Sequence, residues 1–313
     1  MFAYIVRRIF ATIPVMGVVA LFVFSLLYIT PGDPAAVIAG DLATDDDIAR
    51  IRSKLGLDEP FVVRFGSWLW GVLQGDLGIS IFTNLPVTKL IGQRIEPTVA
   101  LSVSTLLVAI VVAVPLGVIA AWKAGQWIDR AVMIFAVLSF SIPVFVLAYL
   151  LIFAFSLSLD ILPVQGYASI GEGLWPFIER LILPSVALGL TYAALIARIT
   201  RASMLEVLSQ DYIRTAQAKG LATDKVLIGH ALKNAAVPIV TIIGIGVALL
   251  ISGVVVTETV FAIPGIGRLT VDAILRRDYP IIQGVILIFS AAYVLINLAV
   301  DLSYTLLDPR IRY

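Results

Sequence analysis

The side chains that proteins use most often for catalysis are scarce in this sequence. The 313-residue chain contains no cysteine, which excludes disulfides and cysteine-based metal sites. Its single histidine, His230, cannot form a histidine cluster alone, and its simplest role is that of a polar residue on a cytoplasmic helix. No lysine follows a glycine, so the G-x-x-x-x-G-K-[ST] phosphate loop is absent, as are H-E-x-x-H and G-x-S-x-G. We expect a protein that is not an enzyme and holds no metal or cofactor.

Composition and charge distribution indicate an integral membrane protein. Hydrophobic residues make up 60% of the chain and charged residues 14%, and the mean hydropathy is +1.03. A transmembrane helix needs about 20 apolar residues, and only helices or closed barrels satisfy their backbone in lipid. The windows without Asp, Glu, Lys or Arg are Ile9–Gly32, Pro97–Trp122, Ala131–Leu159, Leu181–Ala197, Asn234–Thr257 and Tyr279–Val300. These windows are too long for barrel strands, so the sequence predicts an all-α protein with six transmembrane helices. The shortest, Leu181–Ala197, should extend past its charged borders.

The first helix and the net charge need separate consideration. Arg7 and Arg8 precede an apolar run to Ile29, which is longer than the apolar core of a signal peptide and has no small-x-small cleavage site after it. We expect residues 1–32 to be an uncleaved first span. The net charge of +1 gives no reason to expect a nucleic-acid partner.

Loop charges predict the orientation, because cytoplasmic loops are enriched in Lys and Arg. One side of the predicted bundle carries Arg7, Arg8, Lys123, Arg130, Arg198, Arg201, Arg214, Lys219, Lys225, Lys233, Arg310 and Arg312. The two shorter loops of the other side carry only Arg180, Arg268, Arg276 and Arg277. Both termini and the 198–233 loop are therefore expected in the cytoplasm.

The 33–96 segment is expected to be extracytoplasmic and folded. Thr44 and Asp47 resemble a capping box, and Gly56 lies where a helix that begins there would end. An apolar and aromatic stretch, Phe61–Leu73, follows and ends at Gly75-Asp76. The segment either braces the spans, which we favour, or covers the mouth of a pathway.

Within the spans, three features have structural meaning. Pro14, Pro115 and Pro143 are expected to kink helices. The absence of charge deep in the first five spans argues against proton coupling, and Asp301 is expected to pair with Arg7 or Arg8. A stripe of small residues allows another helix, of this chain or of a partner, to approach closely. This stripe consists of Gly244, Ala248 and Ser252.

The loop from 203 to 238 is the richest in signals. Asp211 is placed to cap a short helix that runs to Lys219, and Gly220 stops it. Thr223 is placed to cap a second helix that leads into the fifth span. A short projecting helix suits a groove in another protein. An interfacial linker helix fits the same residues.

Characteristic stretches occur along nearly the whole chain. They read, in order, Leu55-Gly56-Leu57-Asp58-Glu59-Pro60, Gly75-Asp76-Leu77-Gly78-x-Ser80, Arg214-Thr215-Ala216-x-Ala218-Lys219-Gly220-Leu221, His230-Ala231-Leu232-x-Asn234-Ala235, Glu258-Thr259-Val260-Phe261-x-x-Pro264-Gly265-x-Gly267, Asp278-Tyr279-Pro280 with Gln283-Gly284, and Asp308-Pro309-Arg310-Ile311-Arg312-Tyr313. Together these stretches resemble the permeases of binding-protein-dependent ABC importers, in particular the dipeptide, oligopeptide and nickel branch. The wider family has E-A-A-x-x-x-G in the loop, where this chain has Arg214, Thr215 and Ala216 before Gly220.

The resemblance implies a site, a domain plan and partners. The 97–313 region would be a five-helix permease core (type 1 transmembrane domain) after the first span and the 33–96 segment. It implies a bacterial inner membrane location, a second similar permease, two cytoplasmic ATPases and an extracytoplasmic binding protein that delivers peptide, nickel, glutathione or a sugar. Peptide is the broadest class. A stand-alone secondary transporter or channel is the rival. The ATPase-coupling residues implied are Asp211, Tyr212, Arg214, Thr215, Ala216, Ala218, Lys219, Gly220 and Leu221.

Overall fold

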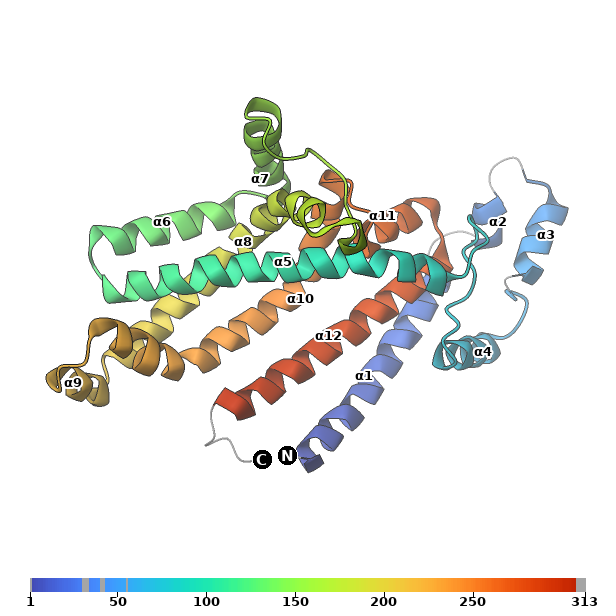
Figure 1. Ribbon diagram of the computed structural model, residues 1–313. Coiled ribbons are helices and arrows are strands. Elements are labelled where there is room, and N and C mark those ends of the chain that lie inside the picture. Colours follow the sequence, from blue (N-terminus) through green and yellow to red (C-terminus); the bar gives the residue numbers. More distant parts are fainter. Residues whose placement is uncertain (1, 30–33, 40–42, 55, 308–313) are drawn as a thin grey trace. The chain divides into compact units, whose positions relative to one another are not determined.

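The computed structural model describes residues 2–29, 34–39, 43–54 and 56–307 (Figure 1). Its regular elements are helices, and an isolated antiparallel bridge joins Ile79 to Pro86. The chain divides into two compact units. Unit 1 comprises Met1–Arg94 and Leu269–Val294, and unit 2 comprises Ile95–Arg268 and Leu295–Tyr313.

Within the described residues, four helices are long and apolar enough to cross a membrane. They are α1 (Phe2–Ile29), α5 (Val87–Trp122), α8 (Leu174–Leu208) and α12 (Tyr279–Leu307). Two bent pairs pass the same test: α6 (Trp127–Ser141) with α7 (Val144–Leu151) and η1 (Ile152–Ser158), and η3 (Lys225–Leu232) with α10 (Ala236–Val260). Counting each bent pair as one span gives six. As predicted, α8 extends past both charged borders of its window.

The third predicted span is not one straight helix. α6 and the helix formed by α7 and η1 meet at an angle of 103°. Pro143 precedes α7 and has no N–H to donate, while Ile142 before it is extended with φ −83° and ψ 123°. Proline disfavours the helical conformation of the residue before it. Pro143 therefore breaks the helix, where the sequence predicted only a kink. Pro14 and Pro115, in contrast, lie inside the continuous helices α1 and α5.

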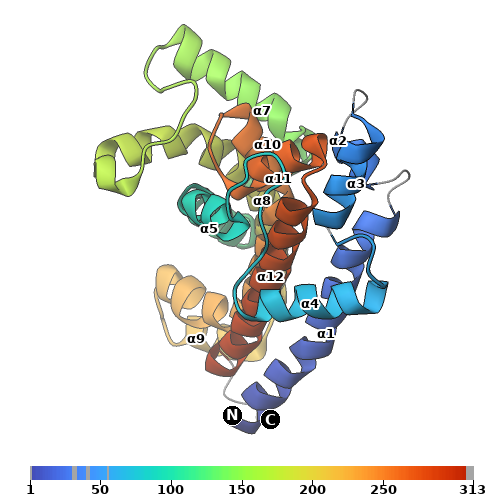
Figure 2. The ribbon, with the colours of Figure 1, turned by 90° about the vertical axis from the view of Figure 1, so that its right-hand side faces the viewer.

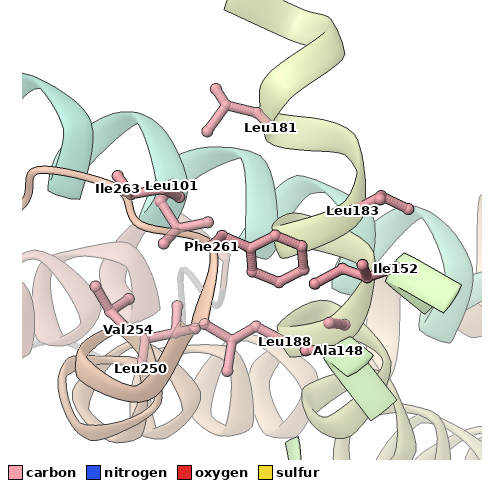
Figure 3. Close-up of a cluster of buried hydrophobic side chains, with 11 residues drawn as sticks. Leu101, Ala148, Ile152, Leu181, Leu183, Leu188, Leu250, Val254, Phe261 and Ile263 are labelled. Atoms are coloured by element: carbon pink, nitrogen blue, oxygen red, sulfur yellow. The ribbon is translucent and has the colours of Figure 1, made fainter. Parts of the chain in front are cut away.

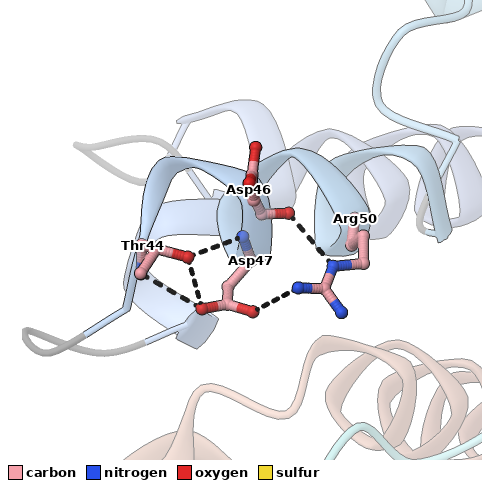
Figure 4. Close-up of polar contacts among 4 residues, drawn as sticks. All are labelled: Thr44, Asp46, Asp47 and Arg50. Carbon is pink, nitrogen blue, oxygen red and sulfur yellow. Dashed lines mark hydrogen bonds and ion pairs between the residues drawn. The ribbon is translucent and has the colours of Figure 1, made fainter.

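In unit 1, α3 (Asp45–Lys54) begins and ends as predicted. The backbone N–H of Thr44 donates to the Asp47 carboxylate, and the N–H of Asp47 donates to the Thr44 hydroxyl (Figure 4). This reciprocal pair is a capping box with aspartate in place of glutamate. At the other end, Gly56 has φ +62° and the N–H of Leu57 donates to the carbonyl of Arg52. Gly56 is therefore the C-terminal cap.

The capping box is expected to weaken at low pH. The hydrogen bonds from the Thr44 hydroxyl and backbone hold the pKa of Asp47 below its usual value of 3.8. A carboxylate with a lowered folded-state pKa stabilises above the unfolded value, and its contribution is lost as pH falls through the folded value. Hydrogen exchange of the α3 amides, corrected for intrinsic rates, should therefore show protection lost below about pH 4. Thr44→Ala should lose that protection already at neutral pH, and a pH-independent protection in the parent would contradict this cap.

Also in unit 1, two motifs about 200 positions apart in sequence pack together. The Ser80 hydroxyl donates to the Asp278 carboxylate at 2.6 Å, and both side chains are buried. A Cβ on Gly284 would lie 2.9 Å from Val87 and 3.3 Å from Leu77, so only glycine fits there. The matches around Gly75–Ser80 and Asp278–Gly284 are thus two sides of one contact.

The core of unit 2 lies where α5, α7, α8 and the loop after α10 meet. Phe261 and Ile263 come from that loop and pack among leucines of α5, α8 and α10 (Figure 3). The cluster consists of Leu101, Ala148, Ile152, Leu181, Leu183, Ala187, Leu188, Leu250, Val254, Phe261 and Ile263.

A buried carboxylate holds this loop. The side chain of Glu258, in the last turn of α10, is fully buried. It accepts hydrogen bonds from the Thr98 hydroxyl of α5 at 2.6 Å and from the Arg268 N–H at 2.9 Å. The Thr98 hydroxyl in turn accepts from the N–H of Ile266. Both N–H groups belong to the first turn of α11 (Ile266–Arg276), whose amides have no acceptor within the helix itself, so Glu258 acts as a remote N-terminal cap.

Candidate functional site: the connection between α8 and α10

The chain between α8 and α10 forms a short helix, α9 (Asp211–Ala218), followed by η3. Figure 1 shows α9 at the same end of unit 2 as the turn between α5 and α6. The second helix begins at Thr223, which is itself helical, and no side-chain cap is formed there. The predicted Thr223 cap is therefore wrong. η3 has π-helical geometry and meets α10 at 71°.

Both ends of α9 differ from the prediction by one residue, but the predicted stop at Gly220 is confirmed. Gln210 occupies the N-cap position in an extended conformation, and Asp211 is the first helical residue, so Asp211 does not cap the helix. Its carboxylate in the first turn still favours the positive end of the helix dipole. The helix ends one residue before Lys219, and Gly220 has φ +78°. The N–H groups of Gly220 and Leu221 donate to the carbonyls of Gln217 and Ala216, which closes the C-terminus.

One side chain anchors α9 to the bundle. Ile213 has an exposed fraction of 0% and packs into a hydrophobic cluster at the ends of four helices. Fully burying an isoleucine side chain stabilises by roughly 1.5–3 kcal/mol. The rest of the cluster comes from α5, α8, η3 and α10: Ala121, Met204, Val226, Leu227, Ala231, Ala235 and Ile239. Ile213 thus places α9 in contact with side chains from all of these helices.

The remaining face of α9 is available to a partner. Tyr212 is exposed despite its aromatic ring, and an ion pair between Arg214 and Asp211, with N and O 3.4 Å apart, joins two exposed side chains. Exposed pairs of this kind contribute little to stability. The other predicted residues on this face, Thr215, Ala218, Lys219 and Gly220, are exposed, while Ala216 and Leu221 are half-buried. Among the described residues, no group of three or more His, Cys, Asp or Glu side chains could hold a metal ion.

An ion pair that the sequence did not reveal lies near this end. Asp129, in the first turn of α6, accepts two hydrogen bonds from Arg201 of α8 at 2.5 and 2.8 Å and one from the Gly125 N–H. The Asp129 side chain is buried and that of Arg201 partly exposed. The two residues are 72 positions apart in the sequence. The one signal that could have suggested the pair is that both lie in loops predicted to be on the same, cytoplasmic side of the membrane.

Removing either partner is expected to destabilise the bundle unequally. Arg201→Ala leaves a buried carboxylate without its cation, whereas Asp129→Ala leaves an arginine that reaches water. Arg201→Ala should therefore cost more, though less than the roughly 3–5 kcal/mol for a fully buried pair. Melting curves of the purified transporter would measure this, with Arg198→Ala, an exposed arginine of α8, as the matched control. Equal effects of Arg201→Ala and Arg198→Ala would contradict the assignment.

Of the three small residues predicted to form a stripe, the structure describes the surroundings of Gly244. A Cβ on Gly244 would overlap Val300 of α12, so glycine permits close approach of α10 to that part of α12. The side chains of Ala248 and Ser252 lie outside the described residues, as do the side chain of Arg8 and the tail 308–313. The predicted pairing of Asp301 and the tail motif therefore stay predictions.

Comparison with known proteins decides the family. Residues 113–313 match the family described as binding-protein-dependent transport system inner membrane component, and residues 1–102 match its N-terminal family. The chain belongs to this family. It is therefore a multi-pass permease of an inner membrane, as the motifs implied.

Full-length relatives bear names from one transport class. A probable peptide ABC transporter permease of Sinorhizobium fredii is 57% identical over 310 residues, with 99% of each chain covered. A dipeptide transport permease of Alkalihalophilus pseudofirmus is 40% identical and a glutathione transport permease of Escherichia coli O6:H1 is 42% identical, each over 100% of both chains. The inward-facing MetNI methionine ABC transporter has a similar fold, with a TM-score of 0.59 at 18% identity over 70% of this permease and 96% of that chain.

Proposed function

We propose that this permease forms half of the translocation pathway of an ATP-driven importer for short peptides, and that α9 docks a cytoplasmic ATPase. The observation that carries the proposal is the construction of α9. Ile213 fixes it to the ends of four helices, Gly220 closes it, and its polar face is left exposed. An interfacial linker helix would need an apolar face toward the lipid. The large apolar residue of α9, Ile213, is instead buried in the bundle, and the exposed side chains around Tyr212 are mostly polar or charged.

The topology that goes with this function has six spans, with each bent pair crossing once. Residues 1–32 form the first span, 33–96 an extracytoplasmic segment, and 97–313 the permease core. Loop charge supports cytoplasmic termini and a cytoplasmic α9. The partners are a second similar permease, two ATPase subunits and an extracytoplasmic binding protein. The permease itself is non-catalytic.

In this mechanism ATP acts through its differential affinity for two states. Closure of the ATPases on ATP moves α9, and the shared cluster around Ile213 passes that movement to α5, α8 and α10. ATP can shift the bundle toward an outward-facing state only if the closed ATPases fit that state better. The binding protein then delivers peptide to the open side.

Co-purification and ligand titration test this proposal. A tagged permease should bring down two kinds of chain, a similar permease and an ATPase, and uptake should require ATP. The binding protein encoded beside it should bind di- and tripeptides, while Ni²⁺ and sugars should not compete. Purification without any ATPase would support a stand-alone channel instead.

Glutathione is the second candidate, because a relative at 42% identity is named a glutathione permease. Glutathione is itself a tripeptide, so the same pathway suits both. Exclusive binding of glutathione in the titration would favour this narrower substrate.

A further inference from the structure

We propose that α4 (Phe61–Leu73) is an interfacial helix whose outer face lies in the lipid at the end of the first span. Its sequence, FVVRFGSWLWGVL, has apolar residues on almost every side of the helix. A helix that is apolar all round is normally buried. At about 1.5 Å per residue, thirteen residues span roughly 20 Å, too short to cross about 30 Å of hydrocarbon.

One face of α4 packs on α1 in unit 1. The ring of Phe24 in α1 lies 5.4 Å from Phe61, 5.5 Å from Phe65 and 5.2 Å from Trp68, measured between centroids. Tyr28, one turn further along α1, contacts Phe61 as well. Figure 2 shows α4 crossing α1 instead of running beside it. The contacts fix α4 at the last two turns of the span, where hydrocarbon meets headgroups.

The opposite face of α4 is exposed among the residues of unit 1 that the structure describes. Val62, Trp70 and Leu73 are exposed to 76%, 65% and 72%. Tyr28 and Ile29, at the end of the apolar α1 and beside the α4 contact, are exposed as well, so the exposed face of α4 lies close to exposed surface of a membrane-spanning helix. An apolar face beside a membrane-spanning surface matches a lipid partner.

Polar groups lie where an interfacial helix needs them. The Arg64 guanidinium lies over the ring of Tyr28 and donates to its hydroxyl, which suits the headgroup level. Charged or polar residues flank the helix, with Asp58 and Glu59 before it and Gln74 and Asp76 after it. Ser67 is exposed and, at about 100° per residue, lies about 140° around the helix from Val62 and about 120° from Leu73, so it is the position predicted to face water.

Spin labelling tests this inference in the assembled transporter. The chain has no cysteine, so Val62→Cys, Leu73→Cys and the control Ser67→Cys can each carry one nitroxide, with partner subunits made cysteine-free. Variants that retain uptake are placed in lipid nanodiscs, and collision rates with O₂ and with a water-soluble nickel chelate are measured. The O₂-to-nickel ratio at positions 62 and 73 should exceed that at position 67 several-fold.

The other outcomes each overturn the inference. Low accessibility of positions 62 and 73 to both reagents would mean that a protein partner covers this face. High accessibility to the nickel chelate would mean that the face lies in water. Two labelled positions keep the test decisive if one variant fails to assemble.

Discussion

Proline at position 220 is expected to abolish uptake while the permease still reaches the membrane. Gly220 has φ +78°, whereas proline fixes φ near −65°, and proline lacks the N–H that Gly220 donates to Gln217. No atom lies within 4 Å of a Cβ built at this position, so a Cβ alone meets no neighbour there. The proline is expected to act by breaking the end of α9.

A graded series separates this cause from others. Gly220→Asn should be the mildest change, because asparagine tolerates the left-handed conformation, and Gly220→Ala should cost about 1–2 kcal/mol. Uptake of labelled peptide, ATP hydrolysis and membrane abundance are measured for each variant. Uptake should fall in the order Asn, Ala, Pro at constant abundance, while ATP hydrolysis loses its stimulation by loaded binding protein. Normal uptake in Gly220→Pro would refute the role of α9.

Charge inversion on the exposed face should uncouple the transporter without unfolding α9. Arg214→Glu keeps the Ile213 anchor and alters only the outward side chain. Because the ion pair with Asp211 is exposed and weak, Arg214→Ala should leave more uptake than Arg214→Glu. Equal loss in both would point to the arginine contact itself, and no loss in either would count against this face.

Alanine at Glu258 is expected to cause the largest loss of stability. The substitution leaves the Arg268 N–H and the Thr98 hydroxyl without their buried acceptor. Each unsatisfied buried group costs roughly 1–3 kcal/mol. The melting temperature of the purified transporter should fall by several degrees in Glu258→Ala. Glu258→Gln keeps one side-chain oxygen, so its melting temperature should lie between those of the parent and Glu258→Ala.

Two further variants test the geometry of that cap. A Cβ on Gly265 would overlap the Glu258 carboxylate, so Gly265→Ala should resemble Glu258→Ala. Glu206→Ala removes an exposed carboxylate of α8 and serves as the matched control. An unchanged melting temperature in both Glu258→Ala and Gly265→Ala would show that the carboxylate does not hold α11.

The sequence predicted those local features that depend on residues close together in the chain. The Thr44–Asp47 box, the Gly56 cap and the Gly220 stop depend on residues within one turn, and each is confirmed. Asp211 was misplaced by one residue, because Gln210 takes the N-cap position without a side-chain bond. Helix propensity does not distinguish adjacent polar residues at such a start.

Contacts between distant segments were beyond the sequence. The pairs Asp129–Arg201, Thr98–Glu258 and Ser80–Asp278 each join residues 70 to 200 positions apart, and no periodicity links them. The matching motifs marked several of these positions but gave no reason for them. In the structure the reason is physical, since a buried carboxylate needs donors and a close approach needs glycine. The sequence did not predict Ile213 as an anchor, because a single apolar residue in a polar helix forms no hydrophobic periodicity.

Site-specific photo-crosslinking from α9 tests the central claim most directly. A photoreactive residue is placed at Tyr212 or Gln217, both exposed on α9, and at Trp175, an exposed control at the start of α8. If α9 docks the ATPase, positions 212 and 217 should crosslink to the ATPase chain with a yield that changes on adding ATP, and position 175 should not. Crosslinks from α9 only to lipid or to the permease itself, with or without ATP, would contradict the account.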